Sequence, residues 1–257
     1  MQNWDGRIGS KMKIFSLSLA GAIILLAQIC LAKLDFIGFD VRPYFFENEK
    51  HELQGINYLL MQEFCKEAHE DCTFKLVPLR DGLQTMERGE ADGLITTAPI
   101  DSRTGYLVYS DVKIEACYGF LTSNEQAIKI KSVEDLAGKK IFVYSPSAAF
   151  EQLQSINKKI NGKISIIETA DLMDPLTRLR DGISADPELM AFGVVLMHKM
   201  EIDRLKIKGL ANVKALQIPF QITVGFSKKR LSKQKIKAMN KILESTWSHT
   251  YDKNQCD

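Results

Sequence analysis

Residues 53–103 read LQGINYLLMQEFCKEAHEDCTFKLVPLRDGLQTMERGEADGLITTAPIDSR, and their pattern decides the fold class. Together with the preceding residues, the periodicity predicts helices at 57–68 and 80–88 and strands at 34–39, 72–77 and 93–97. Gly89 ends the second helix, and a polar segment after the last strand ends on Arg103. The order βαβαβ predicts an α/β lobe of parallel strands, with binding groups just past their carboxyl ends.

A basic and then apolar leader precedes this lobe. Lys11 and Lys13 are followed by an almost uncharged apolar stretch at 14–32 that ends in a small residue, Ala32, at the expected cut. This arrangement predicts a cleavable signal peptide at 1–32, with Met12 as an alternative true start, and therefore a periplasmic protein. The competing interpretation is a retained membrane anchor, but the stretch is marginal in length and is interrupted by polar residues.

Composition limits the classes of function. Removing 1–32 takes the formal net charge from +2 to zero, because that segment holds Asp5, Arg7, Lys11 and Lys13. A neutral mature chain argues against nucleic acid or an anionic membrane as the main partner. About 225 residues can hold one large domain or two ordinary lobes, and the sequence shows no low-complexity stretch and no repeat.

The cysteines take their meaning from an oxidising compartment. Cys65 and Cys72 are spaced so that a turn at a helix end can bring their sulfurs together, which predicts a disulfide. The alternative is a metal site that includes His69, but it would lack a fourth ligand. Cys117, in a strand pattern, is predicted to be a buried free thiol, and Cys256 lies in the tail.

The strand and helix alternation begins again after Cys117. Helices are expected at 132–138, 148–159, 174–180 and 232–251, and strands at 140–144, 163–168, 189–196 and 220–227. Ser132 stands three residues before Asp135, as in a capping box, and Gly138 ends that short helix. Because the pattern restarts, two similar α/β lobes are favoured over one continuous sheet.

Two motifs carry a resemblance to a known family. The segments EFCKEAHEDCTF (63–74) and SVEDLAGKKIFV (132–143) resemble the cysteine pair and the second-lobe entry of periplasmic solute-binding proteins of amino-acid importers. The branch that binds lysine, arginine, ornithine or histidine is the most similar. The resemblance covers 33–251 in element order. It implies a type II periplasmic binding protein fold, in which two α/β lobes are joined by two crossing strands and enclose the ligand between them.

The resemblance also implies where the lobes divide. The first lobe is expected to comprise 33–119 and 222–257, and the second 120–221. The crossing strands are expected near 117–122 and 220–225.

Three positions are expected to hold a ligand carboxylate. Arg103 resembles the family's carboxylate-binding arginine, and a guanidinium can form a bidentate fork; the alternative is a solvated arginine at a helix start. Either Thr96 or Thr97 is expected to offer a hydroxyl. Ser147, before a predicted helix, matches the family's second-lobe hydroxyl, where free backbone N–H groups also point; it can equally be an N-cap.

The loop after the first strand holds the candidates for the ligand side chain. Tyr44 lies where the family places a ring against the ligand, although a loop with three aromatic residues must bury at least one, for which Phe46 is favoured. Asp40 matches an acid of the members that bind basic ligands, and it can also form a turn before Pro43.

The second lobe departs from the family pattern. The position where an aspartate commonly receives the ligand ammonium is Val194 or a neighbour, and no acid follows before Glu201. Pro146 replaces the usual glycine before the hydroxyl. Other candidates for the missing polar partner are Asp186 and Glu188, which can also be solvated loop acids, and His198, which can also be structural.

These features predict a non-enzymatic, monomeric, extracytoplasmic receptor that captures an amino acid or related carboxylate and delivers it to an ABC-type permease. No cofactor, metal or nucleic acid is expected. Two alternatives remain: a periplasmic enzyme on the same scaffold, similar to dehydratase relatives, and a signalling relative that has lost ligand binding. An enzyme would need paired acid and base groups in the cleft.

Overall fold

The computed structural model describes residues 33–247. The predicted leader at 1–32, its alternative start at Met12 and the tail at 248–257 lie outside the described residues. Among the described helices, none has the length and apolar character needed to cross a bilayer.

A mixed sheet of nine strands organises the described residues. Its main path runs β4 (Cys72–Leu76), β1 (Leu34–Gly38), β5 (Gly93–Thr97), β11 (Ile218–Ser227), β6 (Leu107–Ser123), β9 (Leu189–Val194), β7 (Lys140–Tyr144) and β8 (Ser165–Thr169), and β10 (Leu210–Asn212) pairs with β6. β4, β1 and β5 are parallel, as are β9, β7 and β8, whereas β6 and β11 pair antiparallel between these two groups. The predicted parallel βαβ units are therefore confirmed on both sides of an antiparallel centre, but the expectation against one continuous sheet is wrong, because β6 and β11 join both groups by hydrogen bonds.

Seven α-helices cover the sheet within the described part of the chain. They are α2 (Ile56–Glu67), α3 (Leu79–Arg88), α4 (Asn124–Lys129), α5 (Ala148–Lys159), α6 (Asp174–Gly182), α7 (Val195–Arg204) and α8 (Lys233–Trp247). A small hairpin of β2 (Phe46–Glu47) and β3 (Leu53–Gln54) lies outside the main sheet. The helix predicted at 132–138 is a single 3₁₀ segment, Val133–Leu136, whose cap is present because Asp135 accepts the backbone N–H of Ser132.

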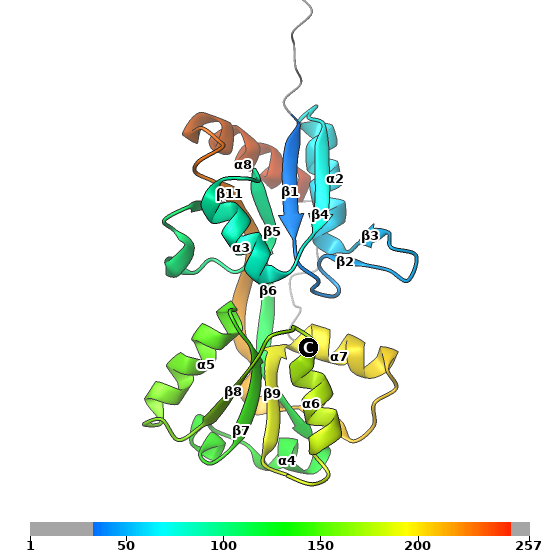
Figure 1. Cartoon of the computed structure of the whole chain (residues 1–257), viewed down its shortest axis with the longest axis vertical. Helices are drawn as coiled ribbons and strands as arrows, with labels where there is room; N and C mark the ends of the chain where they lie inside the picture. Colours follow the sequence, from blue (N-terminus) through cyan, green and yellow to red (C-terminus); the bar gives the residue numbers. More distant parts are fainter. Residues whose placement is uncertain (1–32, 248–257) are drawn as a thin grey trace, which may run out of the picture. The chain divides into compact units, whose positions relative to one another are not determined.

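The hydrophobic core forms separate clusters around two groups of elements. One group, here called the first lobe, packs β1, β4, β5, α2, α3 and α8, with Phe36, Phe64 and Met239 fully buried. The second lobe packs β7, β9, α5, α6 and α7, with Leu153 and Phe192 in its core. Figure 1 shows β6 and β11 passing from one group to the other. The predicted division at 119/120 and 221/222 falls inside these two strands.

The predicted disulfide is confirmed. The sulfurs of Cys65 and Cys72 are bonded, with Cα atoms 6.2 Å apart, and the bond ties the end of α2 to the start of β4. The metal alternative with His69 is therefore wrong, because both sulfurs are already used. The prediction of a free thiol at Cys117 is also wrong: this buried residue is disulfide-bonded. Burial alone does not distinguish a free thiol from a bonded one.

Replacing Cys65 and Cys72 by alanine should lower the free energy of unfolding by about 2 to 3 kcal/mol, because the bond closes a short loop in the unfolded chain. Alanine is chosen because Cys65 is buried, and a serine hydroxyl there would add a cost of its own. Urea unfolding without reductant measures the change. An unchanged midpoint and slope would show that the loop is held by other contacts.

Candidate functional site

A cavity of about 70 Å³ lies where the two lobes and the two long strands meet. Its lining comes from the ends of β5, β7 and β9, the first turns of α5 and α7, and the middle of β6 and β11. Five rings line it: Phe39, Tyr118, Tyr144, Phe192 and Phe220. Aliphatic and thioether side chains fill much of the rest, and the lining contains Arg103 but no aspartate, glutamate or lysine among the described residues. The cavity is therefore mostly apolar with one cation.

Arg103 is buried at the edge of this cavity. It ends the 3₁₀ turn Asp101–Arg103 after β5, and only 5 % of its surface is exposed. One guanidinium N–H, on Nη1, donates to Oγ1 of Thr97 at 3.0 Å, and no carboxylate of the described residues lies within 4.0 Å. Since a guanidinium carries five donors and a buried charge is costly without a counter-charge, the side chain is suited to receive an anion.

The two threonines of β5 have different surroundings. Thr97 accepts the hydrogen bond from Arg103 and does not line the cavity, whereas Thr96 does. The backbone of Thr96 has φ of 66°, a left-handed conformation that is strained for a β-branched residue. Its Oγ1 accepts from Nδ2 of Asn57 at 2.9 Å, which leaves the hydroxyl proton for another acceptor. Thr96 thus faces the cavity, and Thr97 positions Arg103.

The second lobe presents a helix N-terminus to the cavity. Ser147 is the N-cap of α5: its Oγ accepts from the N–H of Phe150 at 3.0 Å and donates to the carbonyl of Tyr144 at 2.6 Å. The next two residues, Ala148 and Ala149, line the cavity, and their N–H groups have no hydrogen-bond partner among the described residues. Free N–H groups and the helix dipole favour an anion here. The N-cap interpretation of Ser147 holds, and the free N–H groups at the start of its helix suit an anion.

Two predicted residues do not line the cavity. Tyr44 is fully buried in an apolar cluster with Val41 and Ile222, and its hydroxyl has no partner among the described residues. The loop turns back between Val41 and Phe45, which sends Tyr44 into the core, so that Phe39 is the aromatic residue of this segment that lines the cavity.

Asp40 is exposed and lies beside a neighbouring hollow together with Asp171. Desolvation raises the pKa of Asp40, and the positive charge of Arg42 opposes this change. Asp186 and Glu188 also lie outside the cavity lining, because they pair with Lys140 and Lys139.

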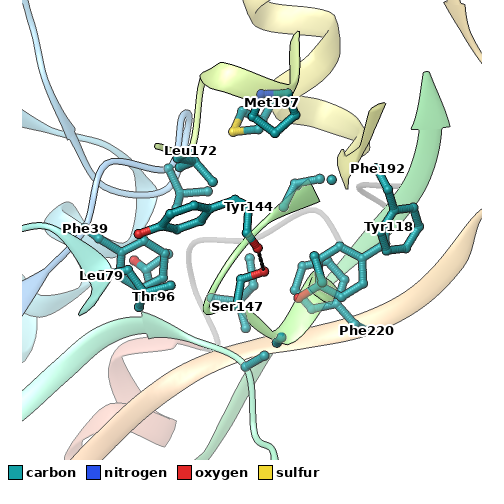
Figure 2. A pocket seen from close by; sticks show the side chains of 18 of the residues that line it. Phe39, Leu79, Thr96, Tyr118, Tyr144, Ser147, Leu172, Phe192, Met197 and Phe220 are labelled. Atoms are coloured by element: carbon teal, nitrogen blue, oxygen red, sulfur yellow. Dashed lines mark hydrogen bonds between the residues drawn. The ribbon is translucent and has the colours of Figure 1, made fainter. Parts of the chain in front are cut away.

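Sequence reasoning missed several residues of the lining. Tyr118 on β6 and Phe220 on β11 stack with ring centroids 3.7 Å apart and planes 5° apart, and Figure 2 shows this pair near Phe192, with Phe39, Leu79 and Thr96 at the opposite side of the view. The signal was present, since both residues fall within the predicted crossing strands. Burial raises the pKa of Tyr118, while the charge of Arg103 lowers it.

His198 lines the cavity from the first turns of α7. Its Nδ1 lies 2.9 Å from Oδ1 of Asn212, a hydrogen-bond acceptor, so Nδ1 carries the proton. Burial lowers the pKa of His198 to about 4, against the opposing hydrogen bond to Asn212. The imidazole is therefore neutral near pH 7, and it occupies the part of the second lobe where no acid was found.

Solved structures show what this fold is similar to. An ancestral arginine-binding protein bound to arginine matches with a TM-score of 0.71 and 18 % identity over 84 % of this chain and 93 % of that chain. The amino acid ABC transporter substrate-binding protein AbpA from Streptococcus pneumoniae, bound to L-arginine, matches with a TM-score of 0.70 and 17 % identity. The match covers 84 % of this chain and 89 % of that chain. A histidine kinase sensor domain with similarity to periplasmic binding proteins matches with a TM-score of 0.70 and 14 % identity. The match covers 84 % of this chain and 90 % of that chain.

No protein-family model and no curated protein matches the sequence. The likeness to solved structures shows that the chain has the type II periplasmic binding protein fold. The predicted resemblance to amino-acid solute-binding proteins is thereby confirmed at the level of the fold.

Proposed function

We propose that this protein is an extracytoplasmic solute-binding receptor that encloses a small carboxylate between its lobes and delivers it to an ABC-type permease. The observation that carries the proposal is Arg103, a buried guanidinium without a carboxylate partner among the described residues, at the cavity that also receives the N-terminus of α5. A carboxylate at this point would accept hydrogen bonds from one group of each lobe. The ligand itself would then bridge the lobes.

Contacts outside the cavity also join the lobes. Nε of Arg42, in the loop after β1, lies 3.5 Å from Oε1 of Glu201 on α7, and Ser102 donates to Glu151 on α5 at 3.0 Å. These polar contacts can form or break when two lobes move about connecting strands. They support a receptor whose affinity depends on closure as well as on contacts with the ligand.

A thermal-shift screen tests the proposed function. The protein is unfolded, washed free of copurified ligand, refolded and melted with panels of carboxylates, amines and sugars, with the methyl ester of each hit as its matched control. A carboxylate at a concentration of about 100 times its Kd should raise the free energy of unfolding by about 2.7 kcal/mol. This raises the Tm of a chain of this size by roughly 5 to 10 °C. Stabilisation by esters as strongly as by acids, or only by amines or sugars, would reject a carboxylate receptor.

Arg42→Gln should weaken the binding of the best carboxylate by about threefold to tenfold, because it removes the charge that links the first lobe to Glu201. Glu201 is 1 % exposed and keeps Arg204 as a partner, so the fold should be retained. Isothermal titration calorimetry gives the change in Kd. The matched control is Arg88→Gln, whose partner Glu90 lies within the same lobe. Equal affinities for both variants would show that the Arg42 contact does not contribute to closure.

A further inference from the structure

Among the described residues, the cavity lining offers no counter-charge for a ligand cation. Arg103 is the charged residue of the described lining, and two acids on the helices beside the cavity already have partners: Glu201 pairs with Arg42 and Arg204, and the exposed Glu151 accepts from Ser102. An ammonium enclosed here would meet neutral acceptors and Arg103, and no carboxylate of the described lining. Because an unpaired buried charge is very unfavourable, an amine next to the ligand carboxylate is disfavoured.

The neighbouring hollow does not supply that counter-charge. Asp40 and Asp171 line it, and it shares Phe39, Leu79, Tyr144 and Leu172 with the cavity. Neither acid lines the cavity itself, so a cation at the far end of a long ligand is better placed to meet them than an amine beside the carboxylate. Arginine is therefore the informative competitor in any test of this site.

His198 offers a different kind of contact. With Nδ1 bonded to Asn212, Nε2 is left with a lone pair, and it has no hydrogen-bond partner among the described residues. Nε2 of His198 lies against Gly193, where an added Cβ would stand only 2.9 Å from it. Both residues line the cavity. A neutral lone pair can accept a hydrogen bond from a hydroxyl without needing a cation.

We propose that the cavity takes a monocarboxylate with an uncharged, mostly apolar body, and that Nε2 of His198 accepts a hydrogen bond from a hydroxyl of that ligand. This inference rests on the proposed function and names its ligand class. Arg103 and the first N–H groups of α5 hold the carboxylate, the rings of Tyr118, Phe192 and Phe220 contact the apolar body, and His198 selects a hydroxy acid over the acid without the hydroxyl.

Two matched ligand sets test the inference by calorimetry at pH 7.5. One set is 3-phenyllactate, 3-phenylpropanoate and phenylalanine. The other is 2-hydroxy-4-methylpentanoate, 4-methylpentanoate and leucine. Arginine is titrated separately as a further ligand in each set. In at least one set, the hydroxy acid should bind about tenfold more tightly than the acid without the hydroxyl, and at least 100-fold more tightly than the amino acid. In His198→Phe the ratio between the hydroxy acid and the acid without the hydroxyl should fall to about one.

The outcomes separate this inference from the proposed function. If arginine or another amino acid binds as tightly as the hydroxy acids, and Arg103→Gln abolishes that binding, the ligand class is wrong and the carboxylate receptor stands. If the hydroxyl preference survives both His198→Phe and His198→Gln, the role of His198 is wrong; the second variant serves if the first does not fold. If no member of either set binds, the ligand class is overturned. Binding of cations without a carboxyl group would overturn both proposals.

Discussion

Arg103→Gln is expected to weaken carboxylate binding by about 30-fold or more. Arg103 is the one charged residue that the described part of the chain places in the cavity lining, and removing one partner of a buried, hydrogen-bonded charge pair costs about 2 to 5 kcal/mol. Glutamine retains two N–H donors but lacks the charge and the fork of the guanidinium, so the variant stays polar while losing both features that hold a carboxylate.

The same substitution should not destabilise the ligand-free protein. In that state the guanidinium is buried without an anion among the described residues, and its removal is expected to leave the Tm unchanged or to raise it. The control is Arg178→Gln on α6, which removes an exposed arginine bonded to Asp174 and should not change the Kd. A ligand Kd within threefold of wild type in Arg103→Gln would contradict the carboxylate-binding role.

His198 should make the protein lose stability between pH 6.5 and pH 4. Its pKa is lowered by burial to about 4 in the folded chain, from an ordinary value of 6.5, so in this window the unfolded chain binds a proton that the folded chain does not. Stability therefore falls as the pH decreases through the window, and the full loss below pH 4 is about 3 kcal/mol.

Urea unfolding of wild type and His198→Gln at pH 7 and pH 4.5 isolates this contribution. Acidification also protonates carboxylates, but their effects are common to both proteins and cancel in the difference. Glutamine is neutral throughout the window. On acidification, the free energy of unfolding of the variant should therefore fall by about 2 to 3 kcal/mol less than that of wild type. His69→Asn, which removes an exposed histidine from a left-handed position, is the matched control and should keep the wild-type pH dependence. Equal losses in wild type and His198→Gln would show that His198 is not buried and neutral.

Local sequence patterns predicted the features that depend on spacing. The bond between Cys65 and Cys72, the cap of α5 at Ser147 and the position of Arg103 after β5 all follow from residues close together in the chain. The alternation of strands and helices likewise predicted both lobes. Very short elements such as β2, β3 and β10 were missed because two or three residues carry no usable periodicity.

Features that depend on distant contacts were not predictable in this way. Which aromatic residue of the first loop lines the cavity depends on the turn between Val41 and Phe45, and not on the number of rings in the loop. Residues Val194 and Val195 are apolar in either state, so the strand was predicted to run on to residue 196, where α7 has already begun. His198 acquires its role from Asn212 on β10, a strand that the sequence pattern did not indicate.

The central claim is that Arg103 and the N-terminus of α5 hold a ligand carboxylate from opposite lobes, and a crystal structure with the tightest-binding carboxylate tests it most directly. The account predicts ligand carboxylate oxygens about 3 Å from the guanidinium of Arg103 and from the N–H groups of Ala148 and Ala149. A carboxylate bound elsewhere in the cavity, or a ligand oriented with another group against Arg103, would contradict it.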